Sequence, residues 1–492
     1  MDTDVIVVGA GPVGLTLAGE LRLSGVRVVV LERLAEPTTE SRASTLHART
    51  MEIFDQRGLL ERLGSPPSQG AGHFGGIPLD FSQLPTRYPG QWKVLQAEVE
   101  KLMAWWATGL GADVRREHDV RHLEVIGDRV RVHADTPSGF VELTGSFVVG
   151  CDGEESTVRA LAGIEFPGVD ATCELLRADV VGIEIPDRRF ERLRNGLAIS
   201  SRRPDGVTRV MVSTFDHQVR HGRQPPTFEE ICKAWELVTG ENIGNGTPVW
   251  CNAFGNASRL ARHYRRGRVL LAGDAAHRQM PSGGQAINLG IQDAVNLGWK
   301  LAAEVRGAAP EGLLDTYDEE RHEVGRQVLC NIEAQGLLLL GGPEVDAIRA
   351  VLAELVRHPV VNDRLASMIS GIDLRYGNDS SPLAGARVPH VELDTGTAVT
   401  STTELLRAGH GVLLDLSGDT GRHGWLRGAA APWAGRVDLV PAMPLPGGLA
   451  DALLADQIGT VLLRPDGYVA WAGDQDSDPR PHIPRWFGLD PH

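Results

Sequence analysis

The feature that most constrains the fold of this chain is a glycine-rich segment near its N-terminus, Gly9-Ala-Gly-Pro-Val-Gly14. An apolar run at residues 4–8 precedes it, and residues 15–23 follow it with apolar side chains at helical spacing. A second apolar run, residues 27–32, ends in Glu32. The order strand, glycine turn, helix, strand predicts a β-α-β unit of about the length that a dinucleotide-binding fold requires.

Each glycine of this segment has a distinct physical role in such a unit. Gly9 permits the tight turn, Gly11 lets a pyrophosphate approach the backbone, and Gly14 lets helix and strand pack closely. Free N–H groups and the dipole at the helix N-terminus favour the phosphates. Glu32 stands where a carboxylate can accept hydrogen bonds from an adenosine ribose. No second motif of this kind follows an apolar strand, so we do not expect a separate nicotinamide-binding domain.

Two further segments carry polar residues beside glycines. One is Gly150-Cys-Asp-Gly153, which is followed by Ser156-Thr-Val-Arg159. The other is Gly273-Asp-Ala-Ala-His277, which leads through a glycine-rich loop at 281–288 into a predicted helix at about 288–305. The N-terminus of that helix would favour negative charge on a bound group, and Asp274 is suited to hold a sugar or polyol hydroxyl.

Charge and cysteine content exclude several classes of function. The net charge of −15 argues against a nucleic-acid partner. Five scattered cysteines without a CxxC pair indicate reduced thiols in a cytoplasmic protein, and sixteen histidines without ligand spacing predict no metal site. Asp2 and Asp4 stand where a signal peptide would be basic, and Glu20, Arg22 and Arg27 interrupt the apolar run that follows. We therefore expect neither a secretory nor a membrane-spanning segment.

The three glycine-containing motifs, in this order and spacing, resemble those of the class A flavoprotein aromatic hydroxylases typified by p-hydroxybenzoate hydroxylase. The sequence is still more similar to the aromatic polyketide hydroxylases of angucycline pathways in actinomycetes. The likeness covers essentially the whole chain and includes Ala48–Gly58, His73–Gly76, Ala253–Asn256 and Ile291–Lys300.

This resemblance implies an α/β fold: a Rossmann-like FAD-binding domain of the p-hydroxybenzoate hydroxylase type, a β-sheet substrate domain and a thioredoxin-like C-terminal domain. We assign residues 1–70, 93–172 and 266–384 to the FAD-binding domain, 71–92 and 173–265 to the substrate domain, and 385–492 to the C-terminal domain.

The resemblance also implies non-covalent FAD, NADPH or NADH as co-substrate, and a set of cofactor-binding residues. The adenosine half of FAD would be held by Gly9, Gly11, Pro12, Gly14, Glu32 and Arg33. Arg42 and Gln96 would lie near the pyrophosphate or ribityl chain, and Asp152 and Arg159 belong to a segment linked to both FAD and NAD(P)H. Gly273 and Asp274 would contact the ribityl chain, and the isoalloxazine ring would be lined by Pro281, Gly283, Gly284, Gln285, Ala286, Ile287 and Asn288.

Ala286 departs from the family pattern, which usually has glycine at this place. Because alanine tolerates a positive φ less well than glycine, the sequence does not determine the path of this loop, but FAD binding is expected to be retained. His277 is expected to shape the loop through hydrogen bonds, whereas His47 and His73 are expected to be loop or surface residues, with lining of the substrate cavity as the alternative. Trp105 and Trp106 are expected to be packing residues of a helix rather than a stacking platform. No residue is singled out as a catalytic base.

The implied activity is NAD(P)H-dependent hydroxylation of a polycyclic aromatic polyketide, of angucyclinone type, by O2 through a flavin C4a-hydroperoxide. The substrate cavity should lie between the FAD-binding domain and the sheet of residues 173–265. Alternatives are a tetracycline- or anthracycline-type hydroxylase, a Baeyer–Villiger oxygenase, a flavin dehydrogenase, or a non-catalytic flavin-binding scaffold protein. A homodimer is compatible with these readings.

Overall fold

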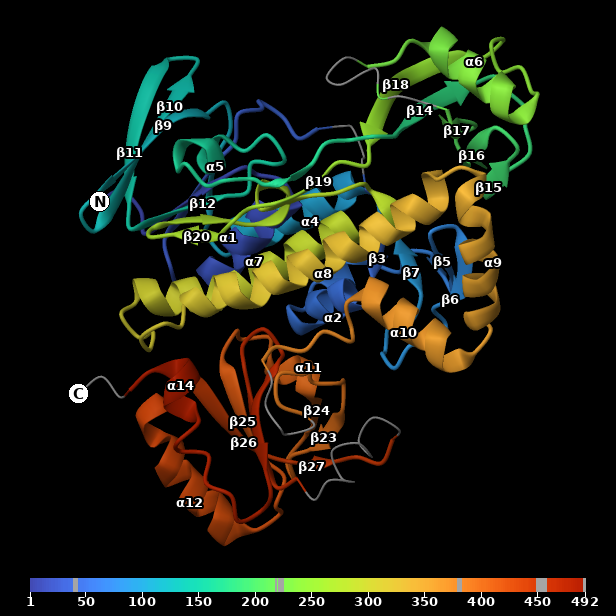
Figure 1. The fold of residues 1–492 in the computed structure, drawn as a ribbon. Coiled ribbons are helices and arrows are strands. Elements are labelled where there is room, and N and C mark those ends of the chain that lie inside the picture. The colour runs from blue at the N-terminus through green and yellow to red at the C-terminus, as the bar shows by residue number, and fades with distance from the viewer. Residues whose placement is uncertain (39–42, 217–218, 220–224, 378–382, 448–457, 490–492) are drawn as a thin grey trace.

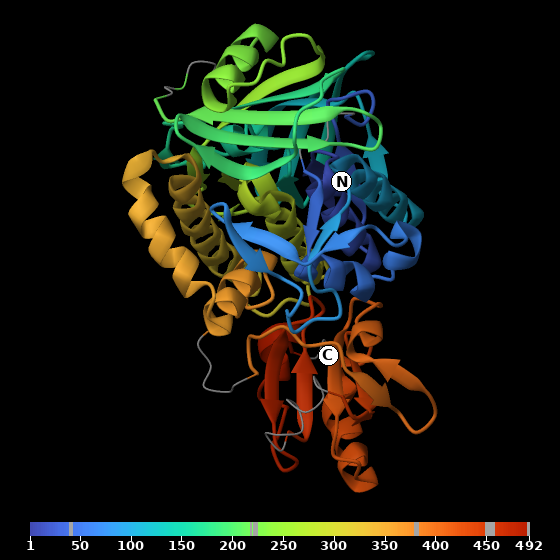
Figure 2. The same ribbon diagram turned by 90° about the vertical axis from the view of Figure 1, so that its right-hand side faces the viewer.

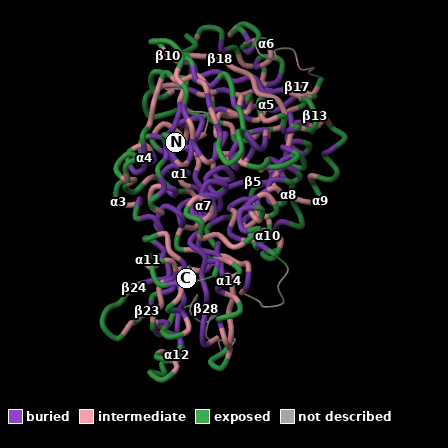
Figure 3. The backbone as a smooth tube through the Cα atoms, turned by 90° about the vertical axis from the view of Figure 1, so that its left-hand side faces the viewer, coloured by how far each residue is buried: buried purple, intermediate pink, exposed green. Residues whose placement is uncertain are grey.

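A computed structural model describes residues 1–492 except 39–42, 217–218, 220–224, 378–382, 448–457 and 490–492. Two long helices run through the middle of the molecule, with sheets above them and a C-terminal α/β unit below (Figure 1). The buried residues concentrate around these helices and around the six-stranded sheet described next, which is called the first sheet below (Figure 3). No helix among the described residues is long and apolar enough to cross a membrane.

The predicted β-α-β unit forms the centre of a six-stranded sheet of order β20-β21-β12-β1-β2-β8. Its strands are β1 Val5–Val8, β2 Val28–Leu31, β8 Asp113–Arg115, β12 Phe147–Gly150, β20 Arg265–Arg266 and β21 Val269–Leu271. All neighbours pair in parallel except β20 with β21. Every residue of β1, β2 and β12 is buried, as expected for a parallel sheet covered on both faces.

Helices cover this sheet and supply the first core. They are α1 Pro12–Leu23, α2 Ala48–Gln56, α3 Leu60–Leu63, α4 Gln96–Gly109, α5 Thr157–Leu161, α7 Gln285–Val305 and α8 Asp315–Leu340. Helix α7 begins three residues before the predicted start, because Gly283 and Gly284 adopt left-handed φ values of 64° and 69° and complete the turn earlier. Within α4, Trp106 is buried, whereas Trp105 is exposed.

A five-stranded antiparallel sheet of order β15-β16-β17-β14-β18 forms a second layer, which lies in the upper part of Figure 2. It consists of β14 Glu174–Val181, β15 Arg188–Leu193, β16 Gly196–Arg202, β17 Thr208–Thr214 and β18 Thr247–Gly255. Successive side chains alternate between its faces. Leu176, Val210 and Val212 pack with Trp235 of α6 (Phe228–Thr239), so one face of the sheet is covered by that helix.

The polar stretch before α4 also forms strands. β3 Thr45–His47 pairs with β7 Gln91–Lys93, which pairs with β4 Ser68–Gln69. β5 Ala71–Phe74 and β6 Ile77–Asp80 form a hairpin that packs on α10 Pro359–Ser370 and α9 Asp346–Leu355. The remaining small sheets are β9 Asp119–Ile126, β10 Arg129–Thr136 and β11 Gly139–Gly145, and β13 Gly168–Val169, β19 Ser258–Leu260 and β22 His277–Arg278.

The C-terminal residues form a mixed sheet of order β26-β25-β28-β29 with a smaller sheet β24-β23-β27 beside it. The strands are β23 Glu392–Asp394, β24 Val399–Ser401, β25 Gly411–Asp415, β26 Val437–Pro441, β27 Met443–Pro444, β28 Thr460–Leu463 and β29 Val469–Gly473, and the helices are α11 Thr402–Leu405, α12 Thr420–Ala430 and α14 Ile483–Phe487. Pro465-Asp466-Gly467 between two apolar runs predicts a hairpin turn. This prediction is confirmed, because β28 and β29 pair in antiparallel fashion across the turn.

Candidate functional site

The three glycine-containing motifs meet at one edge of the first sheet. They follow β1, β12 and β21, which are adjacent parallel strands, so all three lie at carboxyl ends of strands. In open α/β sheets this edge is where ligands bind. The contact is close: a Cβ on Gly9, whose φ is +104°, would lie 2.4 Å from the Cys151 carbonyl oxygen. Segments about 140 residues apart in sequence therefore form one surface.

The first turn fits a pyrophosphate. Gly11 caps α1 in an ordinary extended conformation, with φ −75°, and a Cβ built on it would meet no atom within 4 Å. A Cβ on Gly14, by contrast, would lie 2.0 Å from the Gly9 carbonyl oxygen. Gly14 therefore serves helix–strand packing, whereas Gly11 opens the N-terminus of α1 to a close approach from outside.

The residues expected around the adenosine lie beside this turn. The Glu32 carboxylate accepts hydrogen bonds from the backbone N–H of Ala10 at 2.8 Å and of Leu34 at 2.9 Å, so it faces the glycine turn. Arg33 is exposed next to it. Gln96 begins α4, and its Oε1 accepts the N–H of Ala43 at 3.2 Å. Arg42 lies outside the described residues.

Asp152 and Arg159 fix the second motif in place. The Asp152 carboxylate accepts the hydroxyl of Ser156 and the N–H of Val158, so it closes the N-terminus of α5, and burial raises its pKa. Arg159 donates to the carbonyl oxygens of Glu154 and Ala275, both at 2.8 Å, and stacks on Phe166. Arg159 thereby ties the second motif to the third.

The third motif turns away from β21 as a short 3-10 segment, Gly273–Ala275, in which Asp274 is exposed. His277 is fully buried, and its Nε2 lies 2.8 Å from Oδ2 of Asp293 on α7. This contact agrees with the expected loop-shaping hydrogen bond of His277.

Hydrogen bonds attach the loop between Pro281 and Asn288 to the strand β3. Nε2 of His47 lies 2.7 Å from the carbonyl oxygen of Gly283. Oδ1 of Asn288 accepts the N–H of His47 and the hydroxyl of Thr50, while its Nδ2 donates to the carbonyl oxygens of Thr45 and Gly284. The carbonyl oxygens of both left-handed glycines therefore accept hydrogen bonds from side chains, that of Gly283 from His47 and that of Gly284 from Asn288.

Ala286 causes no backbone strain in this loop. It lies in the first turn of α7, and the only non-glycine residues with positive φ in the described part of the chain are Glu117 and Phe190. The left-handed positions are Gly283 and Gly284, so the conformation for which alanine is unsuited falls on glycines. The lower tolerance of alanine for a positive φ therefore has no consequence at position 286.

The placement of His47 and His73 as surface residues is also wrong. Their exposed fractions are 0% and 7%, and burial lowers the pKa of each to about 4. Because Gly283 offers only an acceptor, Nε2 of His47 carries the proton, and Nδ1 is a buried acceptor with no hydrogen-bond partner among the described atoms. Nδ1 of His73 accepts the N–H of Gly76 at 3.2 Å. Two neutral imidazoles therefore lie beside the loop.

No sequence motif singles out the polar side chains that α8 contributes here. Gln335 is fully buried; its Oε1 accepts the hydroxyl of Ser282 at 3.3 Å, and its Nε2 donates to Oδ1 of Asn331 at 2.8 Å. Asn331 and Gln335 are four residues apart and so share one helix face. The spacing of these two amides on one face of α8 is the sequence feature that could have pointed to their contact with the loop.

The second face of the five-stranded sheet packs with Met280, which directly precedes this loop. The side chains that alternate with the α6-facing set form an apolar surface with Met280 and α8: Cys173, Leu175, Phe190, Leu197, Ile199, Met211, Phe254, Val328, Ile332, Leu339 and Leu340. Several of them, Ile199, Met211 and Phe254 included, are only partly buried. Such a surface suits a flat apolar molecule. Among the described residues no group of three His, Cys, Asp or Glu side chains could hold a metal ion.

Comparison with known families agrees with this geometry. The model for the FAD binding domain matches residues 2–332, about two thirds of the chain, and the model described as "Aromatic-ring hydroxylase, C-terminal" matches residues 381–489. The chain belongs to the family of FAD-dependent aromatic hydroxylases. The expected fold of p-hydroxybenzoate hydroxylase type and the expected cofactor FAD are thereby confirmed, and the members of this class use NAD(P)H as co-substrate.

Relatives of this hydroxylase cover its full length. The 12-dehydrotetracycline 5-monooxygenase/anhydrotetracycline 6-monooxygenase of Streptomyces rimosus is 42% identical over 99% of each chain. The solved structure of CabE, an aromatic hydroxylase from angucycline biosynthesis, is 48% identical over 100% of each chain, with a TM-score of 0.94. The dialkyldecalin synthase of Streptomyces rugosporus is 38% identical over 99% of each chain, so this family also contains a protein named for a different reaction.

Proposed function

We propose that this hydroxylase inserts one atom of O2 into a polycyclic aromatic polyketide, of angucyclinone type, at the expense of NADPH or NADH. The observation that carries the proposal is the partly buried apolar surface of the five-stranded sheet, which packs with Met280, directly before the loop at 281–288. A fused-ring substrate matches such a surface in polarity and shape. The names of the tetracycline and angucycline relatives support the same class of substrate.

FAD would be held without a covalent bond at the edge where the three motifs meet. Gly11 and the N-terminus of α1 would take the pyrophosphate, Glu32 the ribose, and Asp274 the ribityl chain. The loop from Pro281 to Asn288 would border the isoalloxazine ring. When bound, FAD supplies the redox chemistry that protein side chains lack: it accepts a hydride equivalent from NAD(P)H and activates O2.

The chain's own part is to position the ring and to exclude water. The bonds of His47 and Asn288 hold the loop in one shape, and burial keeps His47 and His73 uncharged at neutral pH. An apolar surface opposite the loop would keep water away from reactive oxygen, which limits the loss of reducing equivalents as hydrogen peroxide. The carbonyl group of Gly283 and the side-chain amide of Gln335 provide fixed dipoles at this loop.

For the C-terminal domain we propose a thioredoxin-like fold with a structural role. Its sheet is mixed, with β25 and β26 parallel and β28 and β29 antiparallel, and α12 and α14 flank it. The five cysteines lie at positions 151, 173, 232, 251 and 330, so residues 331–492 have none. Dithiol exchange within this domain is therefore chemically impossible.

A cycloaddition or another cyclisation without oxygen transfer is the second candidate function. It is favoured by the full-length likeness to a dialkyldecalin synthase. In that case FAD would be retained as part of the scaffold, and no NAD(P)H would be consumed during turnover.

The two functions are separated by following labelled oxygen. Purified holoprotein would be incubated with angucyclinone-, tetracycline- and anthracycline-type substrates, NAD(P)H and isotopically labelled O2, and the products analysed by mass spectrometry. We expect one labelled oxygen atom on a ring carbon of the angucyclinone product. Label inserted next to a carbonyl would indicate a Baeyer–Villiger reaction, and an unlabelled dehydrogenated product a dehydrogenase. An isomerised product formed without NAD(P)H would favour the cyclase.

A further inference from the structure

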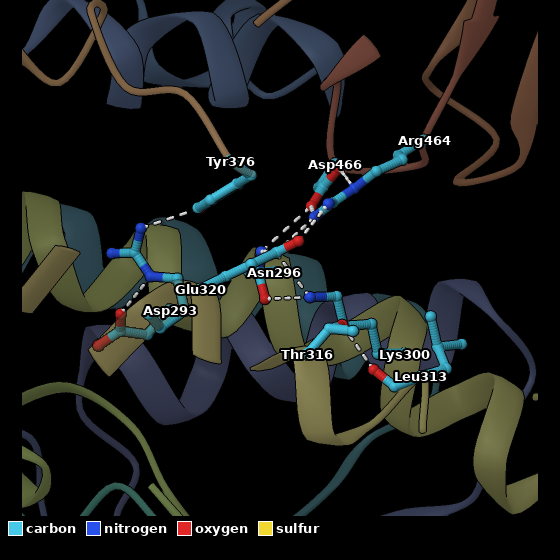
Figure 4. Close-up of polar contacts among 10 residues, drawn as sticks. Asp293, Asn296, Lys300, Leu313, Thr316, Glu320, Tyr376, Arg464 and Asp466 are labelled. Atoms are coloured by element: carbon cyan, nitrogen blue, oxygen red, sulfur yellow. Dashed lines mark hydrogen bonds and ion pairs between the residues drawn. The ribbon is translucent and has the colours of Figure 1, made fainter. Parts of the chain in front are cut away.

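A chain of buried contacts links the C-terminal domain to the turn after β21. In Figure 4, one set of dashed contacts joins Arg464 and Asp466 of the C-terminal domain to α7 and α8, and a second set runs from Tyr376 to Asp293 on α7. None of these residues belongs to the predicted cofactor-binding set. The chain nevertheless ends on Gly273, directly before Asp274.

Asp293 is the end of this chain that meets the turn. Its Oδ2 accepts the backbone N–H of Gly273 at 3.1 Å and lies 2.8 Å from Nε2 of His277. Its Oδ1 accepts Nε of Arg321 at 2.7 Å. The side chains of Asp293, His277 and Arg321 are all fully buried. Burial opposes the charge of Asp293, but the neighbouring Arg321 and His277 outweigh that effect and lower its pKa.

Arg321 is held on three sides, so its orientation determines that of Asp293. Besides Asp293, its guanidinium donates to the hydroxyl of Tyr376 at 3.0 Å and to the carbonyl oxygen of Leu289 at 3.2 Å. A guanidinium is a rigid fork, so a contact at one nitrogen constrains the direction of the others. Without the Tyr376 hydroxyl one donor would be buried without its acceptor, a state that proteins avoid by rearrangement.

Tyr376 itself is placed by the C-terminal domain. Its ring centroid lies 4.4 Å from that of Tyr468, and the guanidinium of Arg464 lies 5.1 Å from the Tyr376 ring centre. The backbone N–H of Tyr376 donates to the carbonyl oxygen of Gly385 at 2.8 Å. Arg464 is in turn fixed by Glu320 of α8, with N–O distances of 2.6 and 2.9 Å.

We propose that Tyr376 is a positioning residue through which the C-terminal domain orients the Gly273–His277 turn, and that its hydroxyl tightens FAD binding without contacting FAD. The inference rests on the proposed function in one respect, namely that Asp274 in this turn contacts the ribityl chain. If the contacts served stability alone, removal of the hydroxyl would lower the free energy of unfolding and leave the affinity for FAD unchanged.

The test compares two tyrosines whose rings are in contact. Tyr376→Phe removes a hydroxyl that accepts from Arg321, whereas Tyr468→Phe removes a buried hydroxyl that has no hydrogen-bond partner among the described atoms. Both changes preserve the ring pair. Full-length apoprotein would be titrated with FAD, with quenching of FAD fluorescence as the signal, and the thermal unfolding of each apoprotein would be recorded.

We expect Tyr376→Phe to raise the Kd for FAD about threefold to about thirtyfold, the usual range for coupling through a packed network. Tyr468→Phe should stay within about twofold of the wild type. At saturating FAD, the visible absorption bands of the flavin should shift in Tyr376→Phe only. Arg321→Lys, which keeps the charge but loses the fork, should weaken binding in the same direction.

Equal Kd values for wild type, Tyr376→Phe and Arg321→Lys would overturn this inference alone. So would an equal loss of affinity in Tyr376→Phe and Tyr468→Phe, because the hydroxyl contact would then not be the cause. Wild-type apoprotein that does not take up FAD at all would overturn the proposed function, and the inference with it.

Discussion

Gly11 is the position where one added side chain should abolish FAD binding while leaving the apoprotein folded. Its φ of −75° is open to any residue, and a Cβ there would meet no protein atom within 4 Å. Gly14, three residues later, is the matched contrast, because its Cβ would lie 2.0 Å from the Gly9 carbonyl oxygen. Gly11→Leu therefore perturbs the ligand site, and Gly14→Ala perturbs the fold.

The expected magnitudes differ accordingly. Gly11→Leu should lower the free energy of unfolding of the apoprotein by no more than about 1 kcal/mol, because leucine is a poorer N-cap than glycine but meets no clash at this position. Gly14→Ala forces a backbone contact that cannot rotate away and should cost about 1–3 kcal/mol. Hydrogen bonds to a charged group contribute about 1.5–3 kcal/mol each, so losing two phosphate contacts in Gly11→Leu should weaken FAD binding at least about a hundredfold.

Urea unfolding of the two apoproteins and FAD fluorescence titration measure these quantities separately. Gly11→Leu should unfold like the wild type and purify colourless. Gly14→Ala should unfold at lower urea concentration. If Gly11→Leu purifies with a full complement of flavin, the assignment of the pyrophosphate to this turn is refuted.

Three further outcomes are expected. Burial lowers the pKa of His47 and of His73 to about 4 in the folded protein, against about 6.5 when unfolded, so the unfolded state binds more protons between these two pH values. Each residue should therefore remove about 3 kcal/mol of stability as the pH falls from about 6.5 to about 4. When urea unfolding is measured across this range, the free energy of unfolding should depend less steeply on pH in His47→Gln than in the wild type. Glu320→Gln leaves the buried Arg464 undercompensated and should lower the free energy of unfolding by about 3–5 kcal/mol, whereas Glu323→Gln, in an exposed pair, should change it little. A hydroxylated polyketide should accelerate anaerobic flavin reduction by NAD(P)H in stopped-flow measurements; equal rates with and without it would show that substrate does not gate reduction.

The parts of the site that local sequence determines could be predicted. The turn at Gly9–Gly14 and the carboxylate of Glu32 follow from strand, turn and helix signals within about thirty residues. The hairpin at 465–467 likewise needs only Pro-Asp-Gly between two apolar runs. In each case a short backbone segment must adopt one conformation, and the few residues of that segment are enough to indicate which.

The burial of His47 could not be predicted in the same way. Its partner Gly283 is 236 residues away, and only the packing of β3 beside the loop brings the two together. The Asp293–Arg321 pair depends in the same manner on how α7 and α8 lie side by side. Apolar periodicity indicates which face of a helix is buried, but it does not indicate which buried polar group meets which partner.

These long-range contacts bear on how the flavin site could move. Reduction by NAD(P)H requires an accessible ring, whereas the oxygen reaction requires one shielded from water, so at least two arrangements are expected. From the sequence, the glycine-rich loop from Gly283 to Asn288 and the segment at 70–76 are the natural elements to permit this movement. In the structure Gly283 and Gly284 are held by His47 and Asn288, and the Gly75 carbonyl oxygen accepts a hydrogen bond from Arg349 at 2.6 Å. Moving either segment would break several buried hydrogen bonds together, each of which is costly to leave unmade. A displacement of the flavin ring along a fixed loop breaks none of them, and is therefore the arrangement that these contacts favour.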